Sequence, residues 1–309
     1  MRGLSARAPP PSVVGVLPTT FIRSMPGTDG CPPGCASDCV MCLARGLPFA
    51  DCEFEVLNIK SLIGDMEHYL QDNLTDEAVV GGGMSGVKYY SPEDFNVQVT
   101  MQGFSILHIN VRSIACNFLK LKILLHSLVK RFDIIICSET WLENKYLQYP
   151  LPDYQFFHQD RDSRGGGVCI YVRDDITCQV INEFTYSVPG GFEALTLKVK
   201  STNFKPVIVS AVYRSPSFRP QVFLSHLSKF LQSELFDHCK SIFTGDFNLD
   251  LSQSSTNPCV EEFVNLFEFH GLLSLINMPT RVQGNSMSIL DCFFTNLHQN
   301  YQAGVTGVN

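Results

Sequence analysis

A carboxylate and a carboxamide stand two residues apart just after the apolar run Ile242 to Thr244. This run suits a buried strand, and Gly245 lets the backbone turn tightly at its end. Because side chains two apart in extended backbone point the same way, Asp246 and Asn248 can act on one small target. The aspartate could take a proton from water while the asparagine orients that water. The alternative is an Asx-type turn, in which both side chains bond their own backbone.

Polar side chains also end three other apolar runs, at Asn110, at Glu139 and at Tyr213 with Arg214. The ends of strands in packed sheets lie along one rim, so residues distant in sequence can meet there. Glu139 suits Mg²⁺, which proteins hold through one or two carboxylates together with water and substrate phosphate. Taken singly, Glu139 could neighbour a helix N-cap and Asn110 could form a turn. Their repetition at successive strand ends favours a metal-assisted phosphodiesterase.

Short apolar strands that alternate with amphipathic stretches would position these residues from Phe104 onward. Many strands with about three helices predict an α/β fold, a layered α/β sandwich of two packed, mostly antiparallel sheets flanked by helices. The predicted strands cover 104–109, 133–137, 154–158, 167–172, 193–199, 207–213, 242–244 and 288–295. The predicted helices cover 114–132, 221–236 and 260–269.

Two segments precede the domain predicted over residues 101–309. Residues 1–30 are rich in Pro, Gly, Ser and Arg, which predicts a disordered leader. Residues 31–100 form a cysteine-containing segment, with a helix-like pattern over 53–80 and a glycine-rich linker after it. Four thiols of this segment could surround Zn²⁺, although an unstructured cysteine-rich tail is an equal alternative. The four candidate zinc ligands are Cys31, Cys35, Cys39 and Cys42.

Composition limits the class of protein further. The chain has 309 residues, of which 45% are hydrophobic and 17% charged, as in globular proteins with a substantial core. A net charge of -7 argues against a sequence-independent grip on a polyanion, yet it suits a nuclease whose acidic residues hold a cation. No stretch approaches 18 consecutive apolar residues and no segment is typical of a signal peptide, so we expect an intracellular protein without a membrane span.

Five motifs follow one another along the chain: His108 to Ser113, Ser138 to Leu142, Val212 to Pro216, Gly245 to Asn248 and Ser288 to Asp291. In sequence and order they resemble the exonuclease-endonuclease-phosphatase superfamily, and in detail the endonuclease domain of LINE-type (non-LTR) retrotransposon polyproteins. Arg161 to Val168, with its three glycines, and Phe192 to Leu195 add to this resemblance. It covers about residues 104 to 309 and implies a DNase I-like fold.

The resemblance implies a role for each matched position. Glu139 would bind Mg²⁺ (or Mn²⁺), with Asn110 beside it as a ligand or as its support. Asp246 would activate the attacking water, Asn248 would orient it, and Tyr213 would hydrogen-bond the scissile phosphate. These roles imply in-line hydrolysis of a DNA phosphodiester, with the metal stabilising charge on the phosphoryl oxygens.

Further implied roles concern the substrate and the partners. Asp291 would orient a catalytic histidine, and substrate would contact Arg214, Thr280 and Ser288. DNA would be the main partner, joined in a complete polyprotein by retrotransposon RNA and a reverse transcriptase domain that extends the nicked strand. Such a protein would work in the nucleus.

One departure from the family pattern and two alternatives remain. The family ends its site with Ser-Asp-His on a further strand, which these 309 residues do not contain, so the resemblance predicts a truncated or degenerate copy lacking its last strand. One alternative is a phosphodiesterase or phosphatase of the same superfamily that acts on a phosphorylated lipid or inositol. The other is a noncatalytic pseudoenzyme or interaction module. The variants Ser138 to Leu142 and Tyr213 to Pro216 favour the retrotransposon branch.

Overall fold

The computed structural model describes residues 16–17, 88–98, 104–128, 131–142, 148–201, 204–283, 286–297 and 303–306. The helix-like segment 53–80, the glycine-rich linker and the four-cysteine zinc site lie outside the described residues. The boundaries of the leader and of the cysteine-containing segment therefore stay predictions. No helix in the described part of the chain is long and apolar enough to cross a membrane.

The first sheet has the strand order β2-β16-β1-β3-β4-β6-β5. Its strands run parallel from β2 to β4, and β6 and β5 then pair antiparallel. Helix α4 (Ile114–Ser127) connects β3 to β4, as a parallel pair requires. The strands are β1 (Val16–Leu17), β2 (Lys88–Tyr90), β3 (Ile106–Asn110), β4 (Ile134–Ser138), β5 (Tyr154–Gln159), β6 (Val168–Arg173) and β16 (Gly304–Thr306).

The second sheet has the order β12-β15-β11-β10-β9-β7, with β8 also paired to β9. Only β10 and β11 are parallel among these described strands, and helices α5 (Pro220–Leu231) and α6 (Glu234–His238) make the crossover between them. The strands are β7 (Thr177–Val180), β8 (Tyr186–Val188), β9 (Phe192–Ser201), β10 (Phe204–Arg214), β11 (Lys240–Asp246), β12 (Leu273–Ser274) and β15 (Asp291–Thr295).

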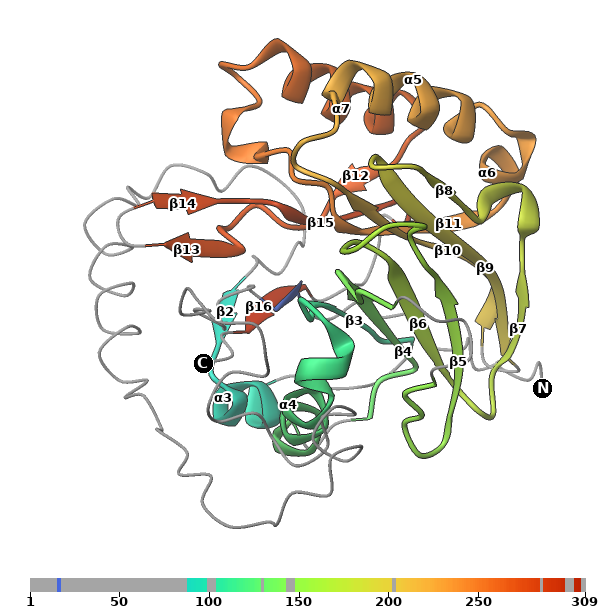
Figure 1. Cartoon of the computed structure of the whole chain (residues 1–309), viewed down its shortest axis with the longest axis vertical. Helices are drawn as coiled ribbons and strands as arrows, with labels where there is room; N and C mark the ends of the chain where they lie inside the picture. The colour runs from blue at the N-terminus through green and yellow to red at the C-terminus, as the bar shows by residue number, and fades with distance from the viewer. Residues whose placement is uncertain are drawn as a thin grey trace, which may run out of the picture. The chain divides into compact units, whose positions relative to one another are not determined.

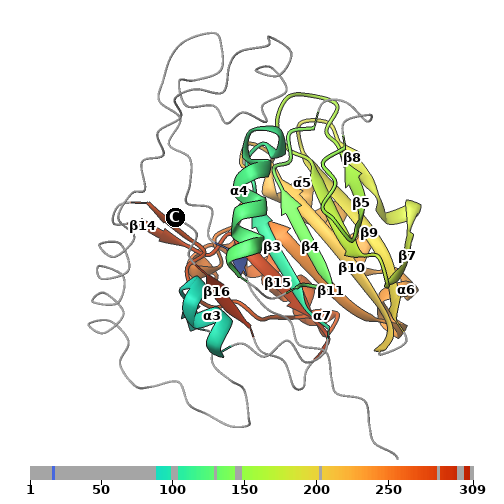
Figure 2. The ribbon, with the colours of Figure 1, turned by 90° about the horizontal axis from the view of Figure 1, so that it is seen from below.

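Helices cover the outer faces of both sheets. Figure 1 shows α5 and α7 (Pro258–Phe269) along the β9 to β11 side, and Figure 2 shows α4 along β3 and β4. The remaining elements are helix α3 (Pro92–Gln98), the short 3-10 helices Asn182–Phe184 and Leu251–Gln253, and a separate hairpin of β13 (Arg281–Gln283) and β14 (Ser286–Ser288). The predicted layered α/β sandwich is confirmed. Its second sheet is mostly antiparallel as predicted, whereas four of the six strand pairs in the first sheet are parallel.

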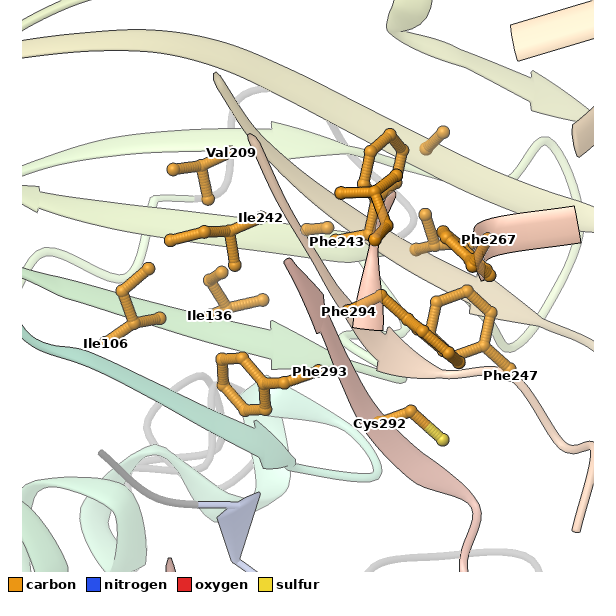
Figure 3. Packing of buried hydrophobic residues seen from close by; sticks show 14 of the residues in the cluster. Ile106, Ile136, Val209, Ile242, Phe243, Phe247, Phe267, Cys292, Phe293 and Phe294 are labelled. Carbon is orange, nitrogen blue, oxygen red and sulfur yellow. The ribbon is translucent and has the colours of Figure 1, made fainter. Parts of the chain in front are cut away.

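The alternation of side chains along β11 divides the core into two layers. Ile242 points between the two sheets, where it meets Ile106 and Ile136 (Figure 3). Its neighbour Phe243 points to the helical side and lies in the aromatic cluster with Phe267. These buried faces explain why the run was predicted as a strand and why both sides of it are apolar.

Two predicted helices differ from the structure. The helix predicted over 114–132 ends at Ser127, and the one predicted over 221–236 consists of α5 and α6. The break between α5 and α6 occurs at Ser233, whose side chain accepts a hydrogen bond from the Leu235 amide and so begins a new helix. Apolar residues continue at helical spacing across this break, so the sequence pattern does not reveal where α5 ends.

Candidate active site

Four ionisable or hydrogen-bonding side chains form a row across the second sheet at one rim. In the strand register, Glu193 on β9 is opposite Tyr213 on β10, which is opposite Asp246 on β11, which is opposite Asp291 on β15. Residues directly opposite each other point to the same face, and neighbouring strands lie about 4.8 Å apart. All four side chains are buried, with at most 5% of each residue exposed. The row therefore presents three carboxyl groups and a phenol to the space between the sheets.

The first sheet contributes Asn110, which joins two of the predicted site residues. Its Nδ2 donates to Glu139 Oε1 at 2.8 Å and to Asp246 Oδ2 at 2.8 Å. Its Oδ1 accepts from the Arg112 amide at 3.1 Å, which fixes the orientation of the carboxamide. Because the oxygen is held by backbone and the nitrogen faces the carboxylates, the geometry favours Asn110 as a support for Glu139 rather than as a metal ligand.

The backbone at this rim is held in sparsely populated conformations. Five of the six non-glycine residues with positive φ in the described chain lie at these strand ends, including Glu139 at 54° and Asn248 at 49°. Hydrogen bonds across the rim hold them, since Ser113 N donates to Glu139 O at 2.7 Å. Such strain persists only where surrounding structure over-determines it. The other three residues are Arg112, Ser113 and Trp141.

Gly245 is required for the approach of β11 to β10. A Cβ at this position would lie 1.7 Å from the Val212 carbonyl oxygen, and its φ of 151° is open to glycine. The expected turn after the strand is thus also a close contact between strands.

The surroundings of Asp246 disfavour its ionised form. Burial, and then the nearby Glu139 carboxylate, raise the pKa of Asp246 to about 7. Three interactions oppose this rise: the Asn248 amide donates to Asp246 Oδ1 at 3.0 Å, Asn110 donates to Oδ2, and the positive charge of Arg281 favours the carboxylate. The bond from Asn248 is the Asx-type turn of the alternative interpretation, so the turn and a reactive carboxylate coexist here.

Asn248 and Arg214 are joined by hydrogen bonds, and the position of Arg214 contradicts the prediction that it contacts substrate. Asn248 Nδ2 donates to Arg214 O at 2.7 Å, and the Arg214 guanidinium donates to the Phe247 and Asn248 carbonyls at 2.7 and 2.6 Å and to that of Phe218. Arg214 follows Tyr213 in the strand, so its side chain points to the opposite face of the sheet. It is 2% exposed and braces the loop after β11 instead of facing substrate.

Thr280 and Ser288 support Asp291 from the start and end of the β13 and β14 hairpin. Thr280 Oγ1 accepts from the Leu290 and Asp291 amides at 3.0 and 3.1 Å, and Thr280 N donates to Ser288 O at 2.9 Å. Thr280 is fully buried, so its hydroxyl orders the backbone beside the site. Ser288 is partly exposed at the rim.

Among the described residues, His108 on β3 is the histidine that contacts Asp291. Its Nδ1 lies 3.6 Å from Asp291 Oδ1, and its Nε2 is 3.1 Å from Ser138 Oγ. Burial lowers the pKa of His108 to about 3 and raises that of Asp291 well above its usual range. Both groups are fully buried, so this pair closes the Asp291 end of the row away from solvent.

The donor set fits a hard divalent cation. Glu139 and Asp246 each place a carboxylate oxygen 2.8 Å from the same amide nitrogen, and the proximity of the two carboxylates raises the pKa of Asp246. A cation would relieve that repulsion, and Mg²⁺ needs only one or two protein carboxylates. Within the described residues, no group of three or more His, Cys, Asp or Glu side chains forms a metal cluster, so these two carboxylates are the candidate site.

Comparison with protein-family models gives a match over residues 107–296 to the endonuclease/exonuclease/phosphatase family. The chain belongs to this family. The match begins within β3 and ends just after β15, and so includes every member of the site. No curated protein matches the chain.

Several solved structures resemble this chain at low identity. The endonuclease domain of TRAS1, a telomere-specific non-LTR retrotransposon, is 15% identical, with a TM-score of 0.47 over 61% of this chain and 82% of that chain. The 3' phosphatase NExo from Neisseria, bound to product DNA hairpin, is 16% identical, with a TM-score of 0.44 over 62% and 85%. TDP2 of D. rerio with single-strand DNA product is 18% identical, with a TM-score of 0.42 over 62% and 82%.

Sequence reasoning gave no role to several residues that complete the site of this family member. Trp141 Nε1 donates to Glu139 Oε2 at 3.2 Å, so both carboxylate oxygens of Glu139 are oriented. Arg161 pairs with Glu193 and lies over the Tyr213 ring. All three residues lie in motifs of the sequence analysis: Trp141 in Ser138 to Leu142, Arg161 at the start of Arg161 to Val168, and Glu193 in Phe192 to Leu195. Their partners, however, are set only by the register and packing of the sheets.

Proposed function

We propose that the chain is a divalent-metal-dependent phosphodiesterase that nicks DNA. The observation that carries this proposal is the double hydrogen bond from the Asn110 amide to Glu139 and Asp246, at the rim where Tyr213 and Asn248 also lie. Membership of the endonuclease/exonuclease/phosphatase family supports hydrolysis at phosphorus, and the paired carboxylates support a cation as its cofactor.

Asp246 would act as the general base. Burial is the main cause that raises the pKa of Asp246, and a carboxylate with a raised pKa accepts a proton from water more readily than an ordinary aspartate does. The Asn248 amide holds Oδ1 of this carboxylate at 3.0 Å and so fixes the direction from which water approaches. The carboxamide of Asn248 is itself fixed on Arg214 O.

Tyr213 would bind the scissile phosphate. Burial, and then the charges of Glu139 and Asp246, raise the pKa of its hydroxyl above the ordinary value, so it stays protonated and donates a hydrogen bond. Glu139 would hold Mg²⁺ or Mn²⁺, with Asp246 beside it and Asn110 and Trp141 orienting its oxygens. When bound, the cation supplies positive charge that stabilises the phosphoryl oxygens and the leaving group.

The substrate proposed is double-stranded DNA, and the biological setting is a LINE-type retrotransposon. The support is the sequence resemblance of Ser138 to Leu142 and Tyr213 to Pro216 to that branch of the superfamily. A nick that leaves a 3'-hydroxyl would prime reverse transcription of element RNA by a reverse transcriptase domain. Work on chromosomal DNA would place the protein in the nucleus.

Nicking of supercoiled plasmid tests the proposal. The full chain should convert supercoiled to open-circle DNA in Mg²⁺ and stop in excess chelator. Asp246→Asn should lower the rate at least about a hundredfold, the usual scale for a lost general base. Asp174→Asn is the matched control, since Asp174 is an exposed aspartate in the turn after β6 and should nick at the parental rate.

Three results would count against the proposal. Equal nicking by Asp246→Asn and the parent would remove this carboxylate from the mechanism. Release of phosphate from an inositol phosphate without any DNA cleavage would support the alternative substrate. No hydrolysis of either substrate by a folded, metal-loaded chain would support a noncatalytic protein.

A further inference from the structure

A buried ion pair between Arg161 and Glu193 lies at the end of the row of site residues. Arg161 Nε donates to Glu193 Oε1 at 2.7 Å and its NH2 group donates to Oε2 at 3.1 Å, so the contact is bidentate. The Arg161 side chain is 8% exposed and the Glu193 side chain 0%. Since desolvation cancels much of the attraction in a buried ion pair, stability alone does not account for this one.

The guanidinium of this pair also fixes Tyr213. Its central carbon lies 5.4 Å from the centroid of the Tyr213 ring, within the range of a cation–π contact. Glu193 is directly opposite Tyr213 in the strand register. Arg161 is therefore held at Glu193 and packs against the ring of the next residue in the row. Movement of the guanidinium would free the phenol that we assign to phosphate binding.

A second chain of contacts leads from the pair to Glu139. The Gly167 amide donates to Glu193 Oε2 at 2.7 Å, and the Gly166 carbonyl accepts from the Trp141 amide at 2.8 Å. Trp141 in turn donates from Nε1 to Glu139 Oε2. One bond from backbone to side chain, one between backbone groups and one between side chains thus connect Glu193 to the candidate metal ligand.

The glycines between these contacts make room for the pair. A Cβ on Gly166 would lie 2.5 Å from the Arg161 guanidinium carbon and 2.6 Å from Glu193 Oε2. A Cβ on Gly167 would lie 2.4 Å from Thr140 Oγ1. Their φ values of 71° and 85° are also unfavourable for side chains. The loop backbone is thereby pressed against the ion pair on one side and the segment after Glu139 on the other.

We propose that Arg161 and Glu193 are positioning residues, which set the Tyr213 ring and the Glu139 carboxylate at a fixed spacing. Their effect on catalysis rests on the proposed function, but their effect on Tyr213 does not. Neither residue touches the reacting atoms in this assignment. The planar guanidinium of Arg161 is required for this role. A lysine ammonium would keep the charge, but it could neither make two parallel hydrogen bonds to Glu193 nor stack on the Tyr213 ring.

The test compares Arg161→Lys and Glu193→Gln with Arg173→Lys. Arg173 is a matched control because it also pairs with a buried carboxylate, Asp133, at 2.6 Å, but at the other end of β6. The protein is labelled with fluorotyrosine and its ¹⁹F spectrum is recorded without metal. The chain has ten tyrosines, and the resonance that disappears in Tyr213→Phe is assigned to Tyr213. Both site variants should shift this ¹⁹F resonance, while Arg173→Lys should lower the melting temperature and leave it in place.

Kinetics provide the second readout. Arg161→Lys should lower kcat for nicking by about a hundredfold, the cost of a displacement near 1 Å, with KM for plasmid little changed. Glu193→Gln, which preserves the shape of the partner, covers the case in which Arg161→Lys does not fold. An unshifted Tyr213 resonance in the folded variants would overturn the positioning role. A shifted resonance in a chain whose parent does not nick would overturn the proposed function and leave the positioning of Tyr213 standing.

Discussion

The two ends of β4 hold carboxylates in opposite circumstances, with Asp133 buried and Glu139 half-buried. Asp133, just before the strand, accepts from Ser105 N at 2.7 Å, from Ser105 Oγ at 2.8 Å and from an Arg173 guanidinium nitrogen at 2.6 Å. At the other end, Glu139 shares the single Asn110 amide nitrogen with Asp246, and the Glu139 charge helps to raise the pKa of Asp246. The carboxylate of Asp133 is thus neutralised by an arginine, whereas the carboxylates of Glu139 and Asp246 repel each other.

The backbone shows the same contrast. Positive φ values accumulate at the Glu139 end, and none is found at Ser105, Asp133 or Arg173. Backbone strain and repulsion between like charges both cost stability, and they persist together where a site requires them. The Asp133 end thus stabilises the sandwich, while the Glu139 end combines strain with like charges at the expense of stability.

Asp133→Ala should produce the largest change in stability. It leaves Ser105 and Arg173 without their shared acceptor and should lower the free energy of unfolding by about 3 kcal/mol. Chemical denaturation followed by fluorescence gives this value. The nicking rate per folded molecule should stay at the parental level, and a selective loss of nicking would erase the distinction between the two ends.

Asp246→Asn, unlike Asp133→Ala, should become more stable relative to the parent as pH rises. The folded pKa of Asp246, about 7, exceeds its ordinary value of 3.8, so its contribution to stability is full below about pH 3.8 and is lost as pH rises through 7. The asparagine variant lacks this loss. Relative to the parent, the metal-free variant should gain on the order of 2 kcal/mol between pH 5 and pH 8. A pH-independent difference in denaturation midpoints would show that Asp246 is not strained.

Glu139→Gln should raise the Mg²⁺ concentration for half-maximal nicking by about tenfold, because a neutral amide attracts the cation less than a carboxylate. Calorimetric titration of the metal-free protein measures the same quantity without substrate. Asp133→Asn is the control from the other end of β4. Identical metal isotherms for parent and Glu139→Gln would place the cation elsewhere.

Trp141→Phe should have the smallest effect. It removes the 3.2 Å bond to Glu139 Oε2 while it keeps an aromatic ring, so metal affinity should fall by about threefold, as for one hydrogen bond. The melting temperature should change little. A tenfold or greater loss would mean that Trp141 holds the whole segment after β4 rather than one oxygen of its carboxylate.

The convergence of the site could be predicted from the sequence because the rule behind it is local. Each apolar run stops at a polar residue, and strand ends meet at a rim, so Asn110, Glu139 and Asp246 were expected to converge. The layered α/β sandwich followed from the same strands. Alternation along a strand could also have corrected one prediction: Tyr213 and Arg214 are adjacent in β10 and cannot both face the site.

The pairs that complete the site could not be predicted, because they depend on register and on packing between sheets. Arg161 and Glu193 are 32 residues apart, and the sequence does not say which residue of β9 would be opposite Tyr213. His108 meets Asp291 only because their sheets face each other. Short strands such as β7, with alternately exposed residues, carry too little apolar signal to be recognised.

The hydrogen bond between Asn110 and Asp246 has a consequence for the timing of folding. It closes a span of 136 residues, so it forms only after β3 and β11 have both been made and the two sheets have docked. During synthesis, Asn110 and Glu139 leave the ribosome long before Asp246 does, and the two carboxylates have no shared partner until then. The growing chain is consequently unable to assemble this site before β11 has left the ribosome.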